Sequence, residues 1–282
     1  MSDSGAALPA VGLTAVGVAA IRAAESERSE RLFSDPFAAG FVGAASSRNR
    51  LEKSAARRGR RPSLAAWVVV RTRFLDDLVL DACARGCLQV VILGAGLDAR
   101  AFRLDWPDNL RVFELDLPQV LDFKQQVVRT EGWHPACERI TVPVDLSDDW
   151  GRPLCEAGFD PGAPVAWLAE GLLAYLSPQV SDTLVAHAAE LSVAGSRMGL
   201  TLASARRMRT WREAHPDGAS TDGDYVALWR STGPDQAGEW LSSHGWRAEV
   251  FHITERAASY GRPLEQDARG ADDARLVDAQ RC

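Results

Sequence analysis

The feature that most constrains the fold is a continuous apolar run that ends in a pair of glycines. Residues 88–93 (LQVVIL) carry no charge and lead directly into Gly94-Ala95-Gly96. Such a run is typical of a strand that is buried on both faces of a parallel sheet. Gly94 permits a sharp turn, Gly96 lets a ligand approach bare backbone, and the helix expected next would direct its first N–H groups at that ligand.

An acidic residue ends the second expected strand. Residues 111–116 (RVFELD) place Glu114 and Asp116 on one face, with Asp116 nearer the carboxyl end. Ligands of parallel sheets bind at that end, where a carboxylate can accept both hydroxyls of a ribose, so we assign this role to Asp116. A lone glycine pair would indicate only a tight turn. The buried strand before it and the acidic strand end after it favour nucleotide binding.

Strands and helices alternate through the rest of the chain, which predicts a doubly wound α/β sheet. Further strands are expected at residues 139–146, 165–169, 198–203, 246–253 and 275–280. Upstream helices are expected at residues 14–31, from Ser34-Asp35-Pro36 onward, and at residues 63–84. We expect a single domain over residues 1–282, divided into an N-terminal helical cap region (1–86), a ligand-binding core (87–203), a helical insertion or lid (204–235) and a C-terminal part of the core (236–282).

Composition excludes several classes of protein. The net charge is -6, which disfavours a general nucleic-acid binder, although lysine occurs only at Lys53 and Lys124 and all other cations are arginines. The basic segment 48–61 has no interleaved aromatic residues and is interpreted as a solvated loop or lid. The uncharged stretch 5–21 is too short and too interrupted for a membrane span. The scattered cysteines indicate neither a disulfide framework nor a metal site. We therefore expect a cytoplasmic protein with no membrane, nucleic-acid or metal partner, and the sequence leaves its oligomeric state open.

Two other interpretations of the glycine loop stay open. The pattern also matches the dinucleotide fingerprint G-x-G-x-x-A, so an NAD-dependent oxidoreductase is one alternative. The long stretch before the first strand and the absence of a Tyr-x-x-x-Lys pair count against it. The other alternative is a catalytically silent nucleotide-binding protein that keeps the pocket as a sensor.

Four motifs in order point to a known family. The runs VVILGAGLDARAFRL, FELDLP, VPVDL and LAEGLLAYL resemble the leucine carboxyl methyltransferase-like family of S-adenosylmethionine (SAM)-dependent methyltransferases. They are most similar to its bacterial branch, which includes polyketide O-methyltransferases. VGLTAVGVAAIRAAESER, RLFSDPFA, VVVRTRFLDD and GWRAEVFHITERAASYGRP extend the resemblance over about residues 12–263. It implies a class I methyltransferase fold, Rossmann-like, with seven strands, the last one antiparallel, and a helical cap.

The resemblance implies which residues bind SAM. Gly94 and Gly96 would lie against its amino-acid part, and Asp116 would hold the ribose. Asp145 and Leu146 would flank the adenine, with Asp145 accepting from the exocyclic amine. Asp145 has a structural alternative as the cap of a following helix.

Charged residues from two further motifs would complete the cofactor site. Arg71, or Arg73, would pair with the SAM carboxylate, a task that suits the guanidinium fork. Residues two apart on a helix diverge, so we expect only one of them to do so. Glu170, after the fourth strand, would face the methionyl ammonium or the mouth of the site. Arg71 and Glu170 could instead be solvated surface charges. Tyr175 matches a family aromatic near the site, or packs against the core.

The predicted activity is SAM-dependent O-methylation of a small molecule, with a polyketide-like natural product as first choice and either a hydroxyl or a carboxylate as acceptor. A carboxylate needs no base, whereas a phenol or enol-like hydroxyl needs one. His215 in the insertion is the candidate base, with an exposed loop histidine as the alternative, because His187 and His252 lie in core elements. The acceptor pocket is expected between the N-terminal helices and the insertion. Its walls could be supplied by three apolar or aromatic residues that could equally form the insertion's own small core, namely Met208, Trp211 and Trp229.

Overall fold

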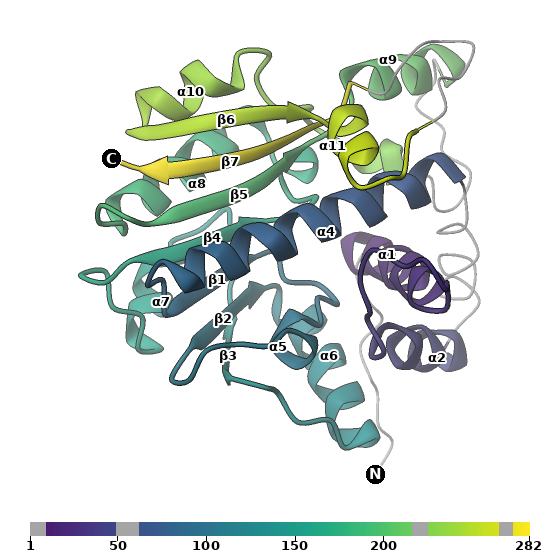
Figure 1. Ribbon diagram of the computed structural model, residues 1–282, viewed down its shortest axis with the longest axis horizontal. Coiled ribbons are helices and arrows are strands. Elements are labelled where there is room, and N and C mark those ends of the chain that lie inside the picture. Colours follow the sequence, from purple (N-terminus) through teal and green to yellow (C-terminus); the bar gives the residue numbers. More distant parts are fainter. Residues whose placement is uncertain (1–9, 49–61, 216–224, 265–272) are drawn as a thin grey trace.

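A single mixed sheet organises the molecule (Figure 1). The computed structural model describes residues 10–48, 62–215, 225–264 and 273–282. The sheet has seven strands in the order β3-β2-β1-β4-β5-β7-β6. Only β7 runs antiparallel to its neighbours β5 and β6. The predicted seven-stranded doubly wound sheet with an antiparallel last strand is therefore confirmed. The strands are β1 (Gln89–Leu93), β2 (Arg111–Asp116), β3 (Glu138–Pro143), β4 (Val165–Ala169), β5 (Arg197–Leu202), β6 (Trp246–His252) and β7 (Arg275–Arg281).

Helices cover both faces of the sheet because the central strands are apolar on both sides. In β1, Val90 and Ile92 belong to one buried cluster, whereas Val91 and Leu93 belong to the other. The first cluster is covered by α4 (Pro62–Ala84), α6 (Pro118–Glu131) and α11 (Ile253–Ser259). The second is covered by α7 (Gly151–Glu156), α8 (Pro178–Glu190) and α10 (Ala237–Ser243).

The first two helices lie near the carboxyl edge of the sheet (Figure 1). Apolar residues of α1 (Ala10–Ser26) and α2 (Ala38–Arg48) pack with Leu97 and Ala99 of the glycine loop and with Phe123 and Val127 of α6. This packing lets residues of α1 reach the ends of β1 and β4.

Helix α1 lies nearer the N-terminus than predicted, at Ala10–Ser26 rather than at residues 14–31. It ends at Ser26 rather than at residue 31, because two side chains at its end accept N–H groups of the following segment. Glu25 Oε1 accepts from Leu32 N at 2.8 Å, and Ser26 Oγ accepts from Asp35 N at 2.7 Å. Asp35 then caps α2 through Ala38 N at 3.0 Å, as the Ser-Asp-Pro pattern predicts.

The insertion after β5 forms α9 (Ala205–Ala214) and the 3₁₀ turn η2 (Tyr225–Leu228). Met208, Val226 and Trp229 are buried together with Ala174 of the 3₁₀ turn η1 (Leu173–Tyr175) and with Ala203 at the end of β5. Met208, Trp211 and Trp229 thus form a small local core, one of the two interpretations of this set, and Met208 also lines a cavity along α9. Of the basic segment 48–61, Arg48 ends α2 and the rest lies outside the described part of the chain. Within the described ranges, no helix is both long enough and apolar enough to cross a membrane.

Candidate active site

The glycine loop adopts backbone conformations that favour glycine. Gly94 and Gly96 have φ values of +66° and +48°. A Cβ on Gly94 would lie 2.9 Å from Leu172 Cδ1, and one on Gly96 would lie 3.3 Å from Ala15 Cβ. Both glycines thus allow a close approach, one toward the segment after β4 and one toward α1. The next helix, α5 (Arg100–Arg103), has only four residues, so the loop rather than a long helix shapes this edge.

Asp116 lies directly beside the loop. Its Oδ2 accepts the N–H of Gly96 at 2.6 Å, and its Oδ1 accepts the N–H of Leu117 at 2.7 Å. Burial raises the pKa of Asp116, while these two N–H groups act in the opposite direction. The structure therefore brings Gly96 and Asp116 together at the carboxyl end of β2, as the sequence predicts.

Glu170 forms the centre of a buried ionic cluster directly after β4. Its Oε1 accepts from Arg22 Nη2 at 2.8 Å, from Arg71 Nε at 3.0 Å and from Thr72 Oγ1 at 3.2 Å. Its Oε2 lies 2.8 Å from Arg100 Nη1. Burial acts to raise the pKa of Glu170, but the three arginines outweigh it and hold that pKa well below its ordinary value. Glu170 is therefore an ionised, buried carboxylate and not a solvated strand end.

Arg71 and Arg73 point in different directions from α4. Arg71 is buried, and its guanidinium carbon lies 4.0 Å from the centroid of the Trp67 ring. Gly171, at φ +66°, leaves room for it, because a Cβ there would lie 2.8 Å from Arg71 Nη1. Arg73 is 41% exposed and binds Asp77 at 2.9 Å. The structure brings Arg71, and not Arg73, to Glu170, as expected for residues two apart on a helix.

Sequence reasoning missed two arginines of this cluster. Arg22 of α1 is buried and also donates to Thr72 Oγ1 at 3.3 Å. Its signal was a single cation inside an otherwise apolar helical run, TAVGVAAIRAA. Arg100 is fully buried, and its signal was the Asp-x-Arg spacing directly after the glycines.

The residues assigned to adenine lie in the turn after β3. The strand ends at Pro143 rather than at residue 146, so Asp145 and Leu146 are not strand residues. Val144 N donates to Asp116 O at 2.9 Å, which ties this turn to the end of β2. Asp145 is exposed and accepts from Ser147 N at 2.9 Å, whereas Leu146 is buried in the core. Of the two side chains, only that of Asp145 is therefore exposed.

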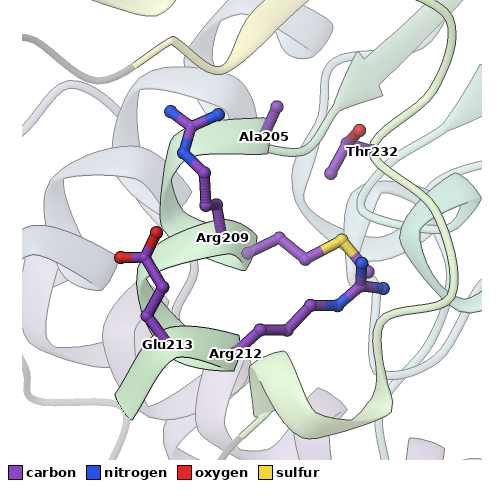
Figure 2. Close-up of a pocket in the computed structure, with 6 residues that line it drawn as sticks. Ala205, Arg209, Arg212, Glu213 and Thr232 are labelled. Atoms are coloured by element: carbon purple, nitrogen blue, oxygen red, sulfur yellow. The ribbon is translucent and has the colours of Figure 1, made fainter. Parts of the chain in front are cut away.

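A cavity of about 370 Å³ lies along α9 (Figure 2). Met208 and Ala205 supply part of its wall, and Thr232 lies on the segment opposite the helix. Arg209, Arg212 and Glu213 are the charged residues that line it.

His215 ends α9 and is held against its own helix. Its ring stacks on Trp211 with a centroid distance of 4.8 Å, and Nδ1 lies 2.9 Å from Trp211 O. Because the carbonyl can only accept, this contact places a proton on Nδ1, so the neutral ring has its lone pair on Nε2. His215 is not among the residues that line the α9 cavity.

The strand order and the acidic residues at its carboxyl edge define a class I methyltransferase fold. Solved structures share it. The chain matches a DUF574 family protein from Streptomyces avermitilis with a TM-score of 0.57, 14% identity and coverage of 94% of this chain and 97% of that one. It matches magnesium protoporphyrin IX methyltransferase from Synechocystis, solved with bound S-adenosylhomocysteine (SAH), with a TM-score of 0.50, 13% identity and coverage of 79% and 88%.

Sequence comparison then gives the family. Residues 15–189 match the model of the leucine carboxyl methyltransferase family, and the chain belongs to this family. A relative from Streptomyces avermitilis, named as an S-adenosyl-L-methionine-dependent methyltransferase, is 47% identical over 258 residues, which are 90% of this chain and 89% of that protein. The predicted family is confirmed: the protein is a SAM-dependent methyltransferase and SAM is its cofactor. The oxidoreductase alternative finds no support.

Proposed function

We propose that this methyltransferase acts on an oxygen, a hydroxyl or a carboxylate, of a small molecule of the polyketide-like natural-product class. The observation that carries the placement of the cofactor is the meeting of Arg22, Arg71 and Glu170 beside the glycine loop. Arginine forks match a carboxylate, and a buried carboxylate matches an ammonium, so this cluster fits the two charges of an amino-acid zwitterion.

The remaining cofactor contacts follow from the same edge of the sheet. Asp116 accepts hydrogen bonds at the end of β2 and would hold the ribose hydroxyls. Asp145, in the turn tied to Asp116, would flank the adenine, whereas the side chain of Leu146 is buried in the core and would not contact it. The bound cofactor supplies a sulfonium methyl group that is already activated. The protein's task is then to orient an acceptor oxygen, exclude water and, for a hydroxyl, remove a proton.

The acceptor would approach from the side of α9. Tyr175 packs against the small core of Met208 and Trp229 and lies on the same segment after β4 as Glu170. This segment therefore connects the core of the insertion to the ionic cluster. The α9 cavity combines an apolar wall with Arg209 and Arg212, which suits an acceptor with an apolar body and an anionic group.

His215 Nε2 is the candidate base for a hydroxyl acceptor. The substitution His215→Ala tests this role when kcat/KM for a phenolic and a carboxylate acceptor is measured across pH. We expect loss of turnover for the phenol and little change for the carboxylate. His244→Ala is the matched control, because His244 pairs with Asp182 on α8 at 2.9 Å. Equal phenol turnover in wild type and His215→Ala across pH excludes His215 as the base.

The overall proposal is tested by titration and by product analysis. Calorimetric titration should show saturable binding of SAH and none of NAD; the reverse pattern would overturn the assigned site. Methyl transfer from labelled SAM is then followed with panels of small phenols, enols, carboxylic acids, amines and thiols. Ether or alkali-labile ester products support the proposal, and exclusive transfer to nitrogen or sulfur contradicts it.

A further inference from the structure

Arg100 is the most connected buried cation of the site, and the cofactor contacts proposed above do not use it. It belongs to α5 and is fully buried. Its Nε donates to Asp76 Oδ1 at 2.7 Å, and Nη1 contacts both Asp98 Oδ2 and, at 2.8 Å, Glu170 Oε2. Nη2 donates to Thr72 O at 3.3 Å. One guanidinium thus joins α4, the glycine loop and the segment after β4.

This arrangement divides the two oxygens of Glu170 between different partners. Oε2 faces Arg100, whereas Oε1 faces Arg22 and Arg71. The carboxylate side chains that contact Arg100 are at most 6% exposed, so water cannot replace a lost contact at low cost. Asp98 and Glu170 carry like charges that act on each other, and Arg100 is the cation that contacts both.

Arg103, one turn along the same short helix, provides an internal comparison. Its side chain is also buried, and it also binds Asp76 Oδ1, at 2.7 Å. Its other charged contact is a long one, 3.9 Å to Asp35 Oδ2, and its guanidinium carbon lies 5.5 Å from the centroid of the Phe33 ring. Arg100 and Arg103 therefore share a helix, a buried side chain and a carboxylate partner. They differ in that only Arg100 contacts Asp98 and Glu170.

We propose that Arg100 is a positioning residue for the reaction: it fixes Glu170 and the Asp98 end of the glycine loop so that both meet the amino-acid end of SAM. The proposal rests on the role proposed above for Glu170. The role requires arginine, because three carboxylates are contacted at once by a planar group with five donors. A lysine keeps the charge but presents one nitrogen, which cannot contact all three. Glu170 would then be free to turn fully toward Arg22 and Arg71 and away from the position of an ammonium.

The test compares two ligands on matched variants. SAH contains the amino-acid end, whereas 5′-methylthioadenosine has the same nucleoside without it. Dissociation constants of both are measured by calorimetry for wild type, Arg100→Lys and Arg103→Lys. We expect Arg100→Lys to weaken the affinity for SAH on the order of tenfold, because one charge-assisted contact is lost. Its affinity for 5′-methylthioadenosine should stay within about twofold, the scatter expected for independent sites. For Arg103→Lys, the affinities for both ligands should stay within about twofold of the wild-type values.

A purely structural role predicts a different pattern. Arg100→Lys and Arg103→Lys would then lower thermal stability alike and leave the ratio of the two dissociation constants unchanged, which would overturn the proposal. If Arg100→Lys does not fold, Asp98→Asn replaces it, because it removes one carboxylate that holds the guanidinium without emptying the site. The ratio of the SAH dissociation constant to the 5′-methylthioadenosine dissociation constant should again rise, and an unchanged ratio overturns the proposal. If wild type itself binds both ligands equally, the failure lies with the role of Glu170.

Discussion

Asp116 and Gly96 lie at the ends of neighbouring strands and are joined by a 2.6 Å hydrogen bond from the Gly96 N–H to Asp116 Oδ2. The bond fixes the position of the loop after β1 relative to the end of β2. The carboxylate that is proposed to hold the ribose is therefore also a part of the loop's own structure. Cofactor affinity and loop geometry should therefore respond together when this carboxylate is removed.

The substitution Asp116→Ala should weaken SAH binding strongly. It removes the acceptor of two backbone N–H groups and the proposed acceptor of the ribose hydroxyls. The expected loss is roughly 1.5–3 kcal/mol for each charge-assisted hydrogen bond to the ligand. Calorimetry with SAH measures it, with Asp122→Ala as control, because Asp122 is exposed on α6. Unchanged SAH affinity in a folded Asp116→Ala protein would reject the assignment.

The substitution Gly94→Ala should destabilise the protein more than Gly132→Ala. Both glycines have φ +66°, so both alanines pay the same left-handed backbone cost, roughly 1–2 kcal/mol. A Cβ at Gly132 meets nothing within 4 Å, whereas at Gly94 it lies 2.9 Å from Leu172 Cδ1. Urea unfolding should therefore show an additional loss for Gly94→Ala, which Leu172→Ala in the same chain partly relieves. Equal losses of unfolding free energy for the two alanine variants would show that the Leu172 side chain moves aside without a measurable energetic cost.

Sequence reasoning predicted the parts of this site that depend on local pattern. The strand ends that carry Asp116 and Glu170 follow from apolar runs, and the choice between Arg71 and Arg73 follows from helix geometry. The predicted ends of β3 and α1 were wrong by a few residues, because side-chain hydrogen bonds and turns at those positions compete with the regular strand or helix. Arg22 could be placed on a helix by periodicity, but its partner Glu170 is distant in sequence and periodicity gives no information about it.

The substitution Glu170→Gln should cost about 3–5 kcal/mol, the range for removing one partner of a buried ion pair. It leaves Arg22 and Arg71 without their carboxylate partner. The pKa of Glu170 is depressed in the folded state, so its stabilising effect is complete above the unfolded pKa. That effect is lost as pH falls from the unfolded pKa through the lower folded pKa.

The measurement is the difference in unfolding free energy between wild type and Glu170→Gln as a function of pH. It should be constant from neutral pH down to about 4.5 and shrink below that, because only the unfolded state then takes up the proton. Glu249→Gln is the control, since Glu249 is exposed on β6 and should show no such dependence. A difference that grows as pH falls from neutral would mean that the folded pKa is raised, contrary to this arrangement.

A second buried cluster should respond unequally to the loss of its anion and of its cation. Glu114 Oε2 lies 2.8 Å from Lys124 Nζ and 2.7 Å from Arg139 Nη2. Glu114→Gln leaves two buried cations without a carboxylate partner, whereas Lys124→Met leaves the pair of Glu114 and Arg139 intact. We expect Glu114→Gln to cost about 3–5 kcal/mol and Lys124→Met at least about 1 kcal/mol less. Asp149→Asn, in an exposed pair with Arg152, is the control and should change stability little.

In the same cluster, the deficit of the variant that lacks the anion should shrink as pH rises, whereas the deficit of Glu170→Gln shrinks as pH falls. Burial lowers the pKa of Lys124, against the opposing effect of Glu114, so Glu114→Gln should lower that pKa further. Between the folded and the unfolded pKa the unfolded state binds the additional proton, and stability rises with pH in this window. The destabilisation caused by Glu114→Gln should therefore be smaller at about pH 9.5, approaching the unfolded pKa of lysine, than at neutral pH. Urea unfolding of wild type and Glu114→Gln at both pH values measures this. A deficit that stays constant or grows with pH would show that Lys124 keeps its proton without Glu114.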